Sequence, residues 1–379
     1  MKQITWRIAT HSADVFGVCS ALFELGGMVV MHDPSGCNST YTTHDEPRWY
    51  DTDSQIYISG LTEKEALFGD TQRLYDDVAA TIKIQQPRFV CLIPSQMSAM
   101  LGLDLRSVAA KLAQNFRIPT FTLPTNSVHY YSQGVYWAME AVAQRFVDAP
   151  PKNGATPNRR QVNLLGFTPL DFALHDPTEC IALLAQNGVQ VNTAWLMGAK
   201  LADLCRASEA TANIAVSYGG LGAARVMQEK FGVPFVVGVP WAGMEKDVIA
   251  AVERRETTPV YLCEHFPVAE DKFVIGDSIL AGSLACLWGK LYGERPRVIC
   301  GVETETWLLN ERDILTNGED ELAEVLGRAK TVVADPLYKV FCAPETEFIP
   351  WPQPGLSGRR FRAQMPHLFK KEGNFLCRT

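Results

Sequence analysis

The sequence lacks the short motifs that mark several common enzyme classes. It has no Gly-x-Ser-x-Gly nucleophile elbow, no Walker phosphate-binding loop and no His-Glu-x-x-His zinc motif. Hydrolases of that type, P-loop kinases and zinc proteases are therefore disfavoured. The ten cysteines stand singly along the chain, and none belongs to a Cys-x-x-Cys pair. Neither a disulfide framework nor the usual spacing of a zinc site is indicated.

Long apolar runs and an excess of positive charge are also missing. No run reaches the ~18 apolar residues that a membrane helix needs, and the N-terminal stretch MKQITWRIATHSAD holds no signal-peptide core. Lys and Arg number 35 against 42 Asp and Glu, a net charge of -7, with no basic stripe. We expect no nucleic-acid partner and no membrane partner. The unpaired thiols favour a cytoplasmic location.

The chain alternates short apolar runs with amphipathic stretches. Continuous apolar runs of this length are typical of parallel strands that are covered on both faces. We predict strands at 27–31, 89–94, 120–123, 162–166, 214–218, 235–239, 272–276, 297–301 and 331–334. We predict helices at 16–25, 71–84, 105–115, 135–146, 221–231, 247–254, 278–291 and 320–328. This alternation predicts an α/β protein of three Rossmann-like, doubly wound units with mostly parallel sheets.

Two stretches divide the chain. Residues 149–161 are polar and rich in proline, as linkers are, and a weaker break lies at 264–271, before a new apolar strand. We therefore predict an N-terminal Rossmann-like domain at 1–155, a middle one at 156–265 and a C-terminal one at 266–379.

The loop after the first predicted strand is the richest in reactive side chains. It contains His32, Asp33, Gly36, Cys37, His44, Asp45, Glu46 and Arg48. A glycine directly before Cys37 lets the backbone approach a bulky inorganic group, and a thiolate is the natural ligand of an iron–sulfur cluster. The ordinary alternative is a polar connecting loop with a buried cysteine.

Two further loops follow predicted strands. Ser-Tyr-Gly-Gly-Leu-Gly at 217–222 resembles a dinucleotide-binding turn, but Arg225 stands where the third glycine belongs. A tight turn with a helix N-terminus that favours anions is the better interpretation. Asp277 or Ser278 is expected to cap the next helix. His129, Tyr130 and Tyr131 either line a cavity or include an ordinary surface histidine.

Several motifs occur in a fixed order. His-Asp-Pro-Ser-Gly-Cys at 32–37 precedes Ser59, Glu63 and the helix start Phe-Gly-Asp-Thr-Gln-Arg-Leu at 68–74. Leu-Gly-Leu-Asp-Leu follows at 101–105, Val-Ser-Tyr-Gly-Gly-Leu-Gly at 216–222 and Asp-Pro-Leu-Tyr-Lys at 335–339. In this order they resemble the nitrogenase component 1 family. That family includes molybdenum–iron protein subunits, cofactor-assembly scaffolds, protochlorophyllide and chlorophyllide reductases and the coenzyme F430 cyclase. The resemblance is strongest at 27–123 and 205–240.

The resemblance implies three Rossmann-like domains and reductive chemistry. Family members hold an iron–sulfur cluster between two component 1 chains, and an ATP-dependent iron–sulfur reductase delivers the electrons. By this resemblance Cys37 is the metal ligand, and Gly36 belongs to its turn. The family's other two ligand cysteines fall at His11 and near Gln96. The family's molybdenum-cofactor cysteine falls at Val216 or Ser217, so a cofactor held in that way is not expected.

A cubane needs about four ligands, mostly thiolates, and one cysteine per chain is too few. We therefore expect a [4Fe–4S] cluster shared with a second component 1-like subunit, in a homo- or hetero-oligomer; a hetero-oligomer whose partner supplies most ligands is favoured. His32, His44, Asp45 and Arg48 are the candidate catalytic residues. Ser217 and Gly219, in the 217–222 loop, are expected to bind cofactor and to face a substrate cavity between domains.

Three functions remain open. The first is the catalytic-component subunit of a nitrogenase-like reductase that acts on a tetrapyrrole or another small molecule. The second is a scaffold or carrier on which a metal cluster is assembled. The third is a metal-free α/β protein that binds a small ligand between its domains. Trp49, Tyr130, Tyr131 and Trp241 are candidates to line an apolar pocket for a planar ring, although each is more often a core residue.

Overall fold

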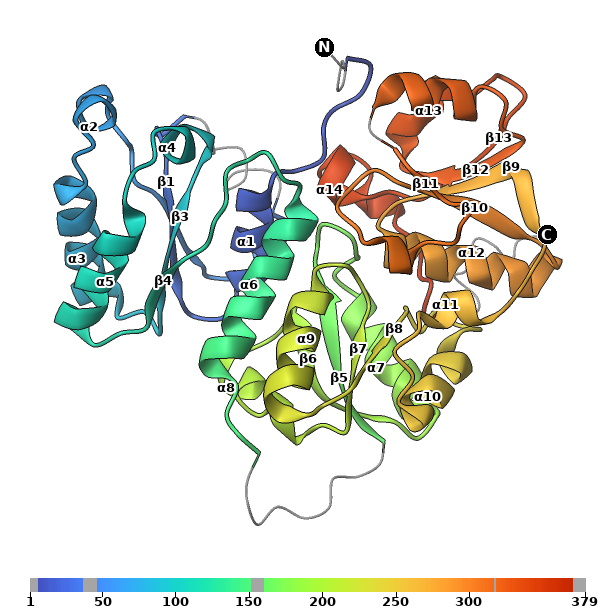
Figure 1. Ribbon diagram of the computed structural model, residues 1–379, viewed down its shortest axis with the longest axis horizontal. Coiled ribbons are helices and arrows are strands. Elements are labelled where there is room, and N and C mark those ends of the chain that lie inside the picture. The colour runs from blue at the N-terminus through green and yellow to red at the C-terminus, as the bar shows by residue number, and fades with distance from the viewer. Residues whose placement is uncertain (1–5, 37–45, 151–159, 317, 371–379) are drawn as a thin grey trace.

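The computed structural model describes residues 6–36, 46–150, 160–316 and 318–370, and contains three β-sheets separated by helices (Figure 1). All strand pairings inside these sheets are parallel. The predicted α/β fold with mostly parallel sheets is therefore confirmed. In the described part of the chain, no helix combines the length and the apolar character that crossing a membrane requires.

The first sheet has the strand order β2-β1-β3-β4. Its strands are β1 (Met28–His32), β2 (Gln55–Ile58), β3 (Val90–Pro94) and β4 (Thr120–Thr122). The helices of this part are α1 (Asp14–Leu22), α2 (Glu63–Phe68), α3 (Gln72–Gln85), α4 (Gln96–Met100), α5 (Leu105–Phe116) and α6 (Tyr131–Phe146). Met28 and Val30 pack in one cluster with α3 and α5, whereas Val29 and Met31 face the cluster that contains α1 and α6. This two-sided packing explains why residues 28–31 of β1 are all apolar.

The second sheet has the order β6-β5-β7-β8. Its strands are β5 (Gln161–Phe167), β6 (Gln190–Leu196), β7 (Ala212–Ala215) and β8 (Phe235–Val237). Its helices are α7 (Asp176–Gln186), α8 (Leu201–Leu204), a 3₁₀ turn η2 (Ala207–Glu209), α9 (Gly220–Phe231), α10 (Glu245–Arg254) and α11 (Val260–Cys263). The buried side chains of this sheet belong to the same core as those of α1 and α6.

The third sheet has the order β11-β10-β9-β12-β13. Its strands are β9 (Val268–Ile275), β10 (Arg295–Cys300), β11 (Ile314–Leu315), β12 (Thr331–Ala334) and β13 (Glu347–Pro350). Its helices are α12 (Ser278–Tyr292), α13 (Glu319–Leu326), α14 (Pro354–Ser357) and the 3₁₀ turns η3 (Thr306–Leu308), η4 (Pro336–Phe341) and η5 (Arg362–Gln364). As expected, Asp277 caps α12, and its Oδ1 accepts a hydrogen bond from the amide of Ile279 at 2.9 Å.

Four strands, β2, β6, β11 and β13, were not predicted, and each lies at an edge of its sheet. Their side chains are mostly partly exposed, so they lack the continuous apolar run that marks a central strand. Helix α7 was also missed. The predicted strand at 214–218 begins two residues earlier, at Ala212, and ends at Ala215, because the following residues turn into α9.

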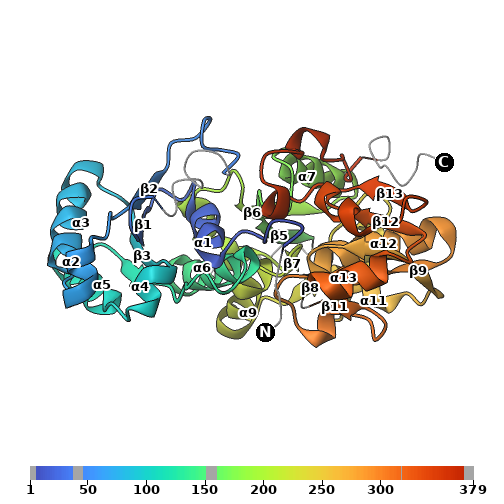
Figure 2. The same cartoon turned by 90° about the horizontal axis from the view of Figure 1, so that it is seen from above.

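Helix α6 lies between the first and second sheets and packs against α1 on one side and α9 on the other (Figures 1 and 2). Both contacts are made through glycine. A Cβ on Gly17 of α1 would lie 2.0 Å from the carbonyl oxygen of Tyr131, and one on Gly134 of α6 would lie 1.9 Å from that of Asp14. A Cβ on Gly222 of α9 would lie 2.1 Å from the carbonyl oxygen of Tyr136. The three helices therefore touch backbone to backbone.

This contact predicts a large cost for one added methyl group. We expect Gly134→Ala to lower the free energy of unfolding by roughly 3 kcal/mol or more, since the backbone of α1 must move away. Gly301→Ala is the matched control, because its Cβ would come no closer than 3.6 Å to any neighbour. Guanidinium unfolding of the two variants beside the wild type measures the difference. Equal stability of both variants would contradict the close crossing.

Candidate functional site

The first candidate site is the edge of the first sheet where the parallel strands end. Ligands of open α/β sheets bind at this carboxyl edge. His32 is the last residue of β1 and lies opposite Pro94 of β3 in the strand register. Its Nδ1 is 2.8 Å from the Ser59 hydroxyl, just beyond the end of β2. The ends of β1 and β2 thus bring two polar side chains together beside the end of β3.

His32 is almost fully buried, with 2% of its surface exposed. Burial lowers its pKa from 6.5 to about 4; nearby Glu65 raises the pKa, and Arg73 lowers it. The imidazole is therefore neutral at pH 7. Its Nε2 is buried and has no hydrogen-bond partner among the described residues. In the tautomer in which Nδ1 donates to Ser59, Nε2 has a lone pair available as a hydrogen-bond acceptor or metal ligand.

The other predicted residues of this loop are placed only in part. Gly36 is exposed, and nothing lies within 4 Å of the position that a Cβ would take. Gln96 is the first residue of α4 and is exposed near the end of β3. Cys37, His44 and Asp45 lie outside the described residues, so their roles stay predictions.

The described thiols near the first sheet do not suit a metal cluster. Cys19 of α1 and Cys91 of β3 are both 0% exposed and belong to the apolar core. Burial raises the pKa of both thiols well above the ordinary value, so they stay protonated at neutral pH. Cys91 lies inside a strand, as its sequence position indicates. Since a cluster needs thiolates, neither residue can replace the missing ligands at His11 and Gln96.

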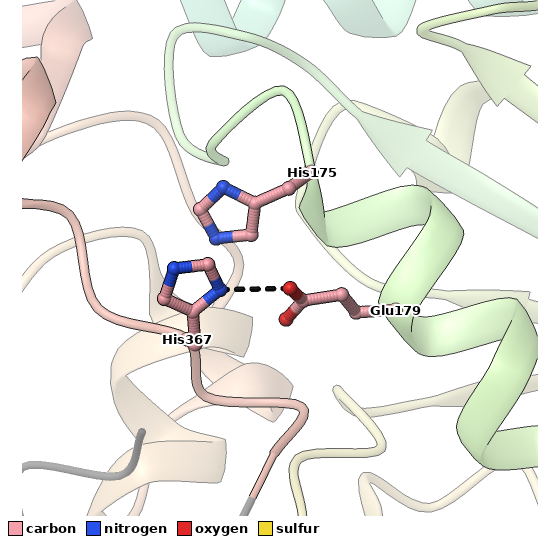
Figure 3. Close-up of side chains that lie close together, drawn as sticks. All are labelled: His175, Glu179 and His367. Carbon is pink, nitrogen blue, oxygen red and sulfur yellow. Dashed lines mark hydrogen bonds and ion pairs between the residues drawn. The ribbon is translucent and has the colours of Figure 1, made fainter. Parts of the chain in front are cut away.

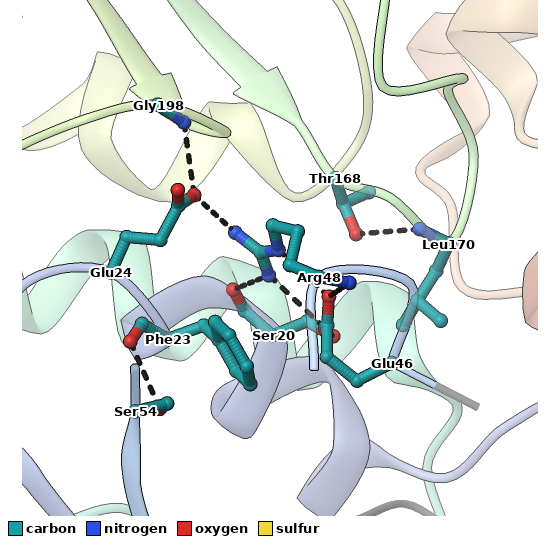
Figure 4. A network of polar contacts seen from close by, with 9 residues as sticks. All are labelled: Ser20, Phe23, Glu24, Glu46, Arg48, Ser54, Thr168, Leu170 and Gly198. Carbon is teal, nitrogen blue, oxygen red and sulfur yellow. Dashed lines mark hydrogen bonds and ion pairs between the residues drawn. The ribbon is translucent and has the colours of Figure 1, made fainter. Parts of the chain in front are cut away.

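Arg48 lies in a buried network of charges (Figure 4). Its guanidinium contacts Glu46 and Glu24 at 2.7 Å each, and it also donates to the carbonyl oxygen of Ser20 at 2.8 Å. Glu24 accepts a further hydrogen bond from the amide of Gly198, beyond β6. These contacts connect the segment of residues 20–48, beside the first sheet, to the loop after β6 of the second sheet. Removal of one partner from such a network leaves a buried charge unpaired. The catalytic role expected for Arg48 stays a prediction.

His11 lies at a different place, in a cavity of about 340 Å³ between the N-terminal segment and the third sheet. The lining includes Tyr130, Glu303 and Tyr338. The His11 ring meets that of Tyr130 edge to face, with centroids 5.5 Å apart. Burial lowers the pKa of His11 to about 4, so it is a neutral side chain at pH 7.

Two carboxylates hold the segment that carries His11. Glu303 accepts from the amide of Tyr130 at 2.7 Å, which fixes the start of α6. Glu319 accepts from the amides of Arg7 and Ile8 at 2.9 and 3.1 Å. Sequence reasoning missed both residues. The signal for Glu303 was its position three residues after β10, in a loop at the carboxyl edge of a sheet.

Ser217 and Gly219 are buried where α9 begins. The Ser217 hydroxyl donates to the carbonyl oxygen of Gly166 at 2.8 Å, and a Cβ on Gly219 would lie 2.3 Å from the Val135 side chain. The structure places both in close packing between β5, α9 and α6. This arrangement agrees with the tight-turn interpretation, and their cofactor-binding role stays a prediction.

Two buried carboxyl groups, those of Asp171 and Asp277, lie near this turn, between the second and third sheets. The Tyr131 hydroxyl donates to Asp171, and Asp277 accepts from the amide of Tyr218 at 3.1 Å. Burial and the nearby Asp277 carboxyl raise the pKa of Asp171. Tyr131 and Trp241 are buried core residues, whereas Tyr130 lines the His11 cavity.

Comparison with known proteins gives three findings. A model of the family described as nitrogenase component 1 type oxidoreductase matches residues 15–246. One subunit of the light-independent protochlorophyllide reductase of Nostoc punctiforme is 27% identical over 185 residues, which is 47% of this chain and 36% of that protein. The corresponding subunit of Prosthecochloris aestuarii is 30% identical over 216 residues, 56% of this chain and 39% of that protein. The chain thus matches little more than a third of the length of these relatives.

Solved structures agree with the fold. Two structures titled Nitrogenase Cp1, at pH 6.5 and pH 5, superpose with TM-scores of 0.57 and 0.56. They are 15% and 16% identical, and the matches cover 85% and 86% of this chain and 70% and 72% of theirs. At this identity the likeness concerns the fold alone.

The buried neutral His32 predicts a pH dependence of stability. Between its unfolded pKa of 6.5 and its folded pKa of about 4, the unfolded chain binds a proton that the folded chain excludes. The free energy of unfolding should therefore fall as the pH drops, by about 2 kcal/mol from this group between pH 7 and pH 5. His32→Asn, which keeps a polar partner for Ser59, should show a smaller fall. A His32 that titrates near 6.5 by NMR in the folded protein would refute this.

Proposed function

Since the chain belongs to the nitrogenase component 1 type oxidoreductase family, we propose that it is a catalytic-component subunit of a nitrogenase-like reductase. In this proposal it pairs with a second component 1-like chain and accepts electrons from an ATP-dependent iron–sulfur reductase. The observation that carries the proposal is the family match over residues 15–246. That match includes the carboxyl edge of the first sheet.

An iron–sulfur cluster would take one thiolate from this chain, Cys37. Cys19 and Cys91 are protonated core thiols, so the remaining ligands would come from the partner chain or from a nitrogen such as His32 Nε2, which is buried and unpaired among the described residues. The bound cluster supplies one-electron transfer. His32 and Ser59 would shape its surroundings, since hydrogen bonds and burial tune the potential of a cluster.

A tetrapyrrole is the substrate class that the relatives suggest, since those named above are subunits of protochlorophyllide reductase. The cavity beside His11 offers one place for a reducible molecule. Its lining combines apolar groups with polar atoms of His11, Tyr130, Tyr338 and Glu303, as ligand sites usually do. At about 340 Å³ it is at the small end of such sites. A tetrapyrrole would therefore need further surface from the partner chain, whereas a smaller molecule would not.

The second candidate function is a scaffold or carrier for cluster assembly. It needs the same fold and the same cysteine but no electron transfer to a substrate. The burial of the described thiols Cys19 and Cys91 favours it, because a cluster held by few ligands of one chain is more easily passed on.

Electron transfer separates the two functions. We expect the complex of this chain with its component 1-like partner to lose visible cluster absorption when the reductase component and MgATP are added. Protochlorophyllide, as the probe substrate, should restore that absorption as it is reduced. Cys37→Ser should abolish the response, and the control Cys342→Ser should keep it. A cluster that stays oxidised under these conditions, yet moves to an apo-ferredoxin acceptor, would establish the scaffold function instead.

A further inference from the structure

A cluster of metal-ligand side chains lies on the second sheet's outer helix, away from both sites described above. His175 is the residue that precedes the first turn of α7, and Glu179 follows one turn later. Residues four apart share a helix face. His367, from the segment after η5, lies against them, and its ring stacks on that of His175 with centroids 3.8 Å apart (Figure 3).

The ligand atoms of these residues already converge. One ligand atom each from His175, Glu179 and His367 lies within 4.8 Å of the other two. Tetrahedral Zn²⁺, with bonds of about 2.0–2.1 Å, holds its nitrogen and oxygen ligands about 3.4 Å apart. The stacked rings of His175 and His367 must turn for their nitrogens to face one ion, and the hydrogen bond between His367 and Glu179 must then be exchanged for bonds to the ion.

Three buried polar atoms at this place have no hydrogen-bond partner among the described residues. They are Nε2 of His175, Oδ1 of Asp176 and Oε2 of Glu179. The side chains of Asp176 and Glu179 are only 6% and 8% exposed. Asp176 Oδ1 lies 3.5 Å from His175 Nε2, which is too long for a good hydrogen bond. Unpaired buried polar atoms are rare in native structures, and a bound ion or water is one explanation for them.

One oxygen of the Glu179 carboxylate is already hydrogen-bonded, and the other is available to an ion. Oε1 of Glu179 accepts from Nδ1 of His367 at 2.7 Å and from the Lys370 ammonium at 2.6 Å. Oε2 makes neither of these contacts and has no hydrogen-bond partner among the described residues. The His175 ring also interacts with the backbone carbonyl of Pro366, and such an outer contact orients a metal-binding histidine. Lys370 brings one positive charge, and it pairs with the Glu179 carboxylate.

We propose that His175, Glu179 and His367 bind a divalent transition-metal ion, Zn²⁺ before others, and that the ion fastens the segment 365–370 to α7. Two imidazoles and one carboxylate form a donor set that suits zinc and disfavours Mg²⁺ and Ca²⁺. The His175 and His367 side chains are 34% and 48% exposed, so water reaches the ion and fills its fourth position.

The segment that the ion would fasten covers part of the core. The carbonyl oxygen of Leu368 accepts from the amide of Ala242 at 3.0 Å, and the Phe369 ring lies 4.8 Å from that of Trp241. Both Leu368 and Phe369 are 2% exposed. An ion that binds only the folded state raises its stability by mass action, so zinc should hold this cover in place.

Metal titration of the full chain tests the proposal. Chelator-treated wild type should bind one equivalent of Zn²⁺ or Co²⁺ at this site, and zinc should raise the midpoint of thermal unfolding. The Co²⁺ spectrum should show ligand-field bands without the charge-transfer band of a thiolate, which separates this site from Cys37. Glu179→Gln and His367→Ala should each weaken binding by at least about tenfold, whereas His265→Ala, an exposed histidine elsewhere, should not.

Two results would overturn the proposal: unchanged affinity in both variants, or a cobalt spectrum with thiolate ligation alone. If a variant fails to fold, the wild type still decides the question. Zinc should then protect His175 and His367 from modification by diethyl pyrocarbonate while His265 stays reactive. Equal modification of the three histidines with and without zinc would also refute the site. None of these readouts depends on the reductase activity.

Discussion

The backbone contacts of helix α6 are the constraint on which the rest of the structure depends. Gly17 and Gly134 let the backbones of α1 and α6 touch, and Gly222 does the same for α9 and α6. Because there is no room for a Cβ at these crossings, the first and second sheets are held at a fixed separation. The start of α6 then reaches the third sheet through Glu303, which accepts from both Tyr130 and Ser132. One helix thus positions the carboxyl edges of three sheets.

His32 and His11, which the sequence predicts at one cluster site, lie at the edges of two different sheets. His32 and Ser59 meet at the edge of the first sheet, whereas His11 turns into the cavity beside the third sheet. Burial of Cys19 and Cys91 in the core between α1 and β3 removes two thiols from any metal chemistry. In the proposed function, Cys37 is the remaining thiol of this region for a cluster, and a second chain would complete the ligand set. The proposed need for a partner chain therefore rests on the burial of Cys19 and Cys91 as well as on the number of cysteines.

Central strands such as β1, β3 and β12 could be predicted, because strands that are buried on both faces consist of consecutive apolar residues. The edge strands β2, β6, β11 and β13 could not, since their partly exposed residues carry mixed patterns, whereas the edge strands β4 and β8 were predicted. Helix α7 did carry a signal, with Pro177 in its first turn and Cys180 and Leu184 on one face, and it was missed. The pairing of Glu179 with His367, 188 residues apart, leaves no local trace. The same holds for Glu319 and the segment at Arg7. Motif order located the family and the cysteine turn, but only tertiary structure shows that His11 faces a different cavity.

In the proposed function, Cys37 is this chain's one thiolate in an iron–sulfur cluster that a partner chain completes. The most direct measurement is the iron and acid-labile sulfide content of anaerobically purified protein, alone and co-purified with the partner. We predict little iron in the isolated chain and a full cluster in the complex. Cys37→Ser should lower that content, whereas Cys91→Ser, a core thiol, should not once the variant has folded. An unchanged content in Cys37→Ser, or no iron in either preparation, would contradict the account.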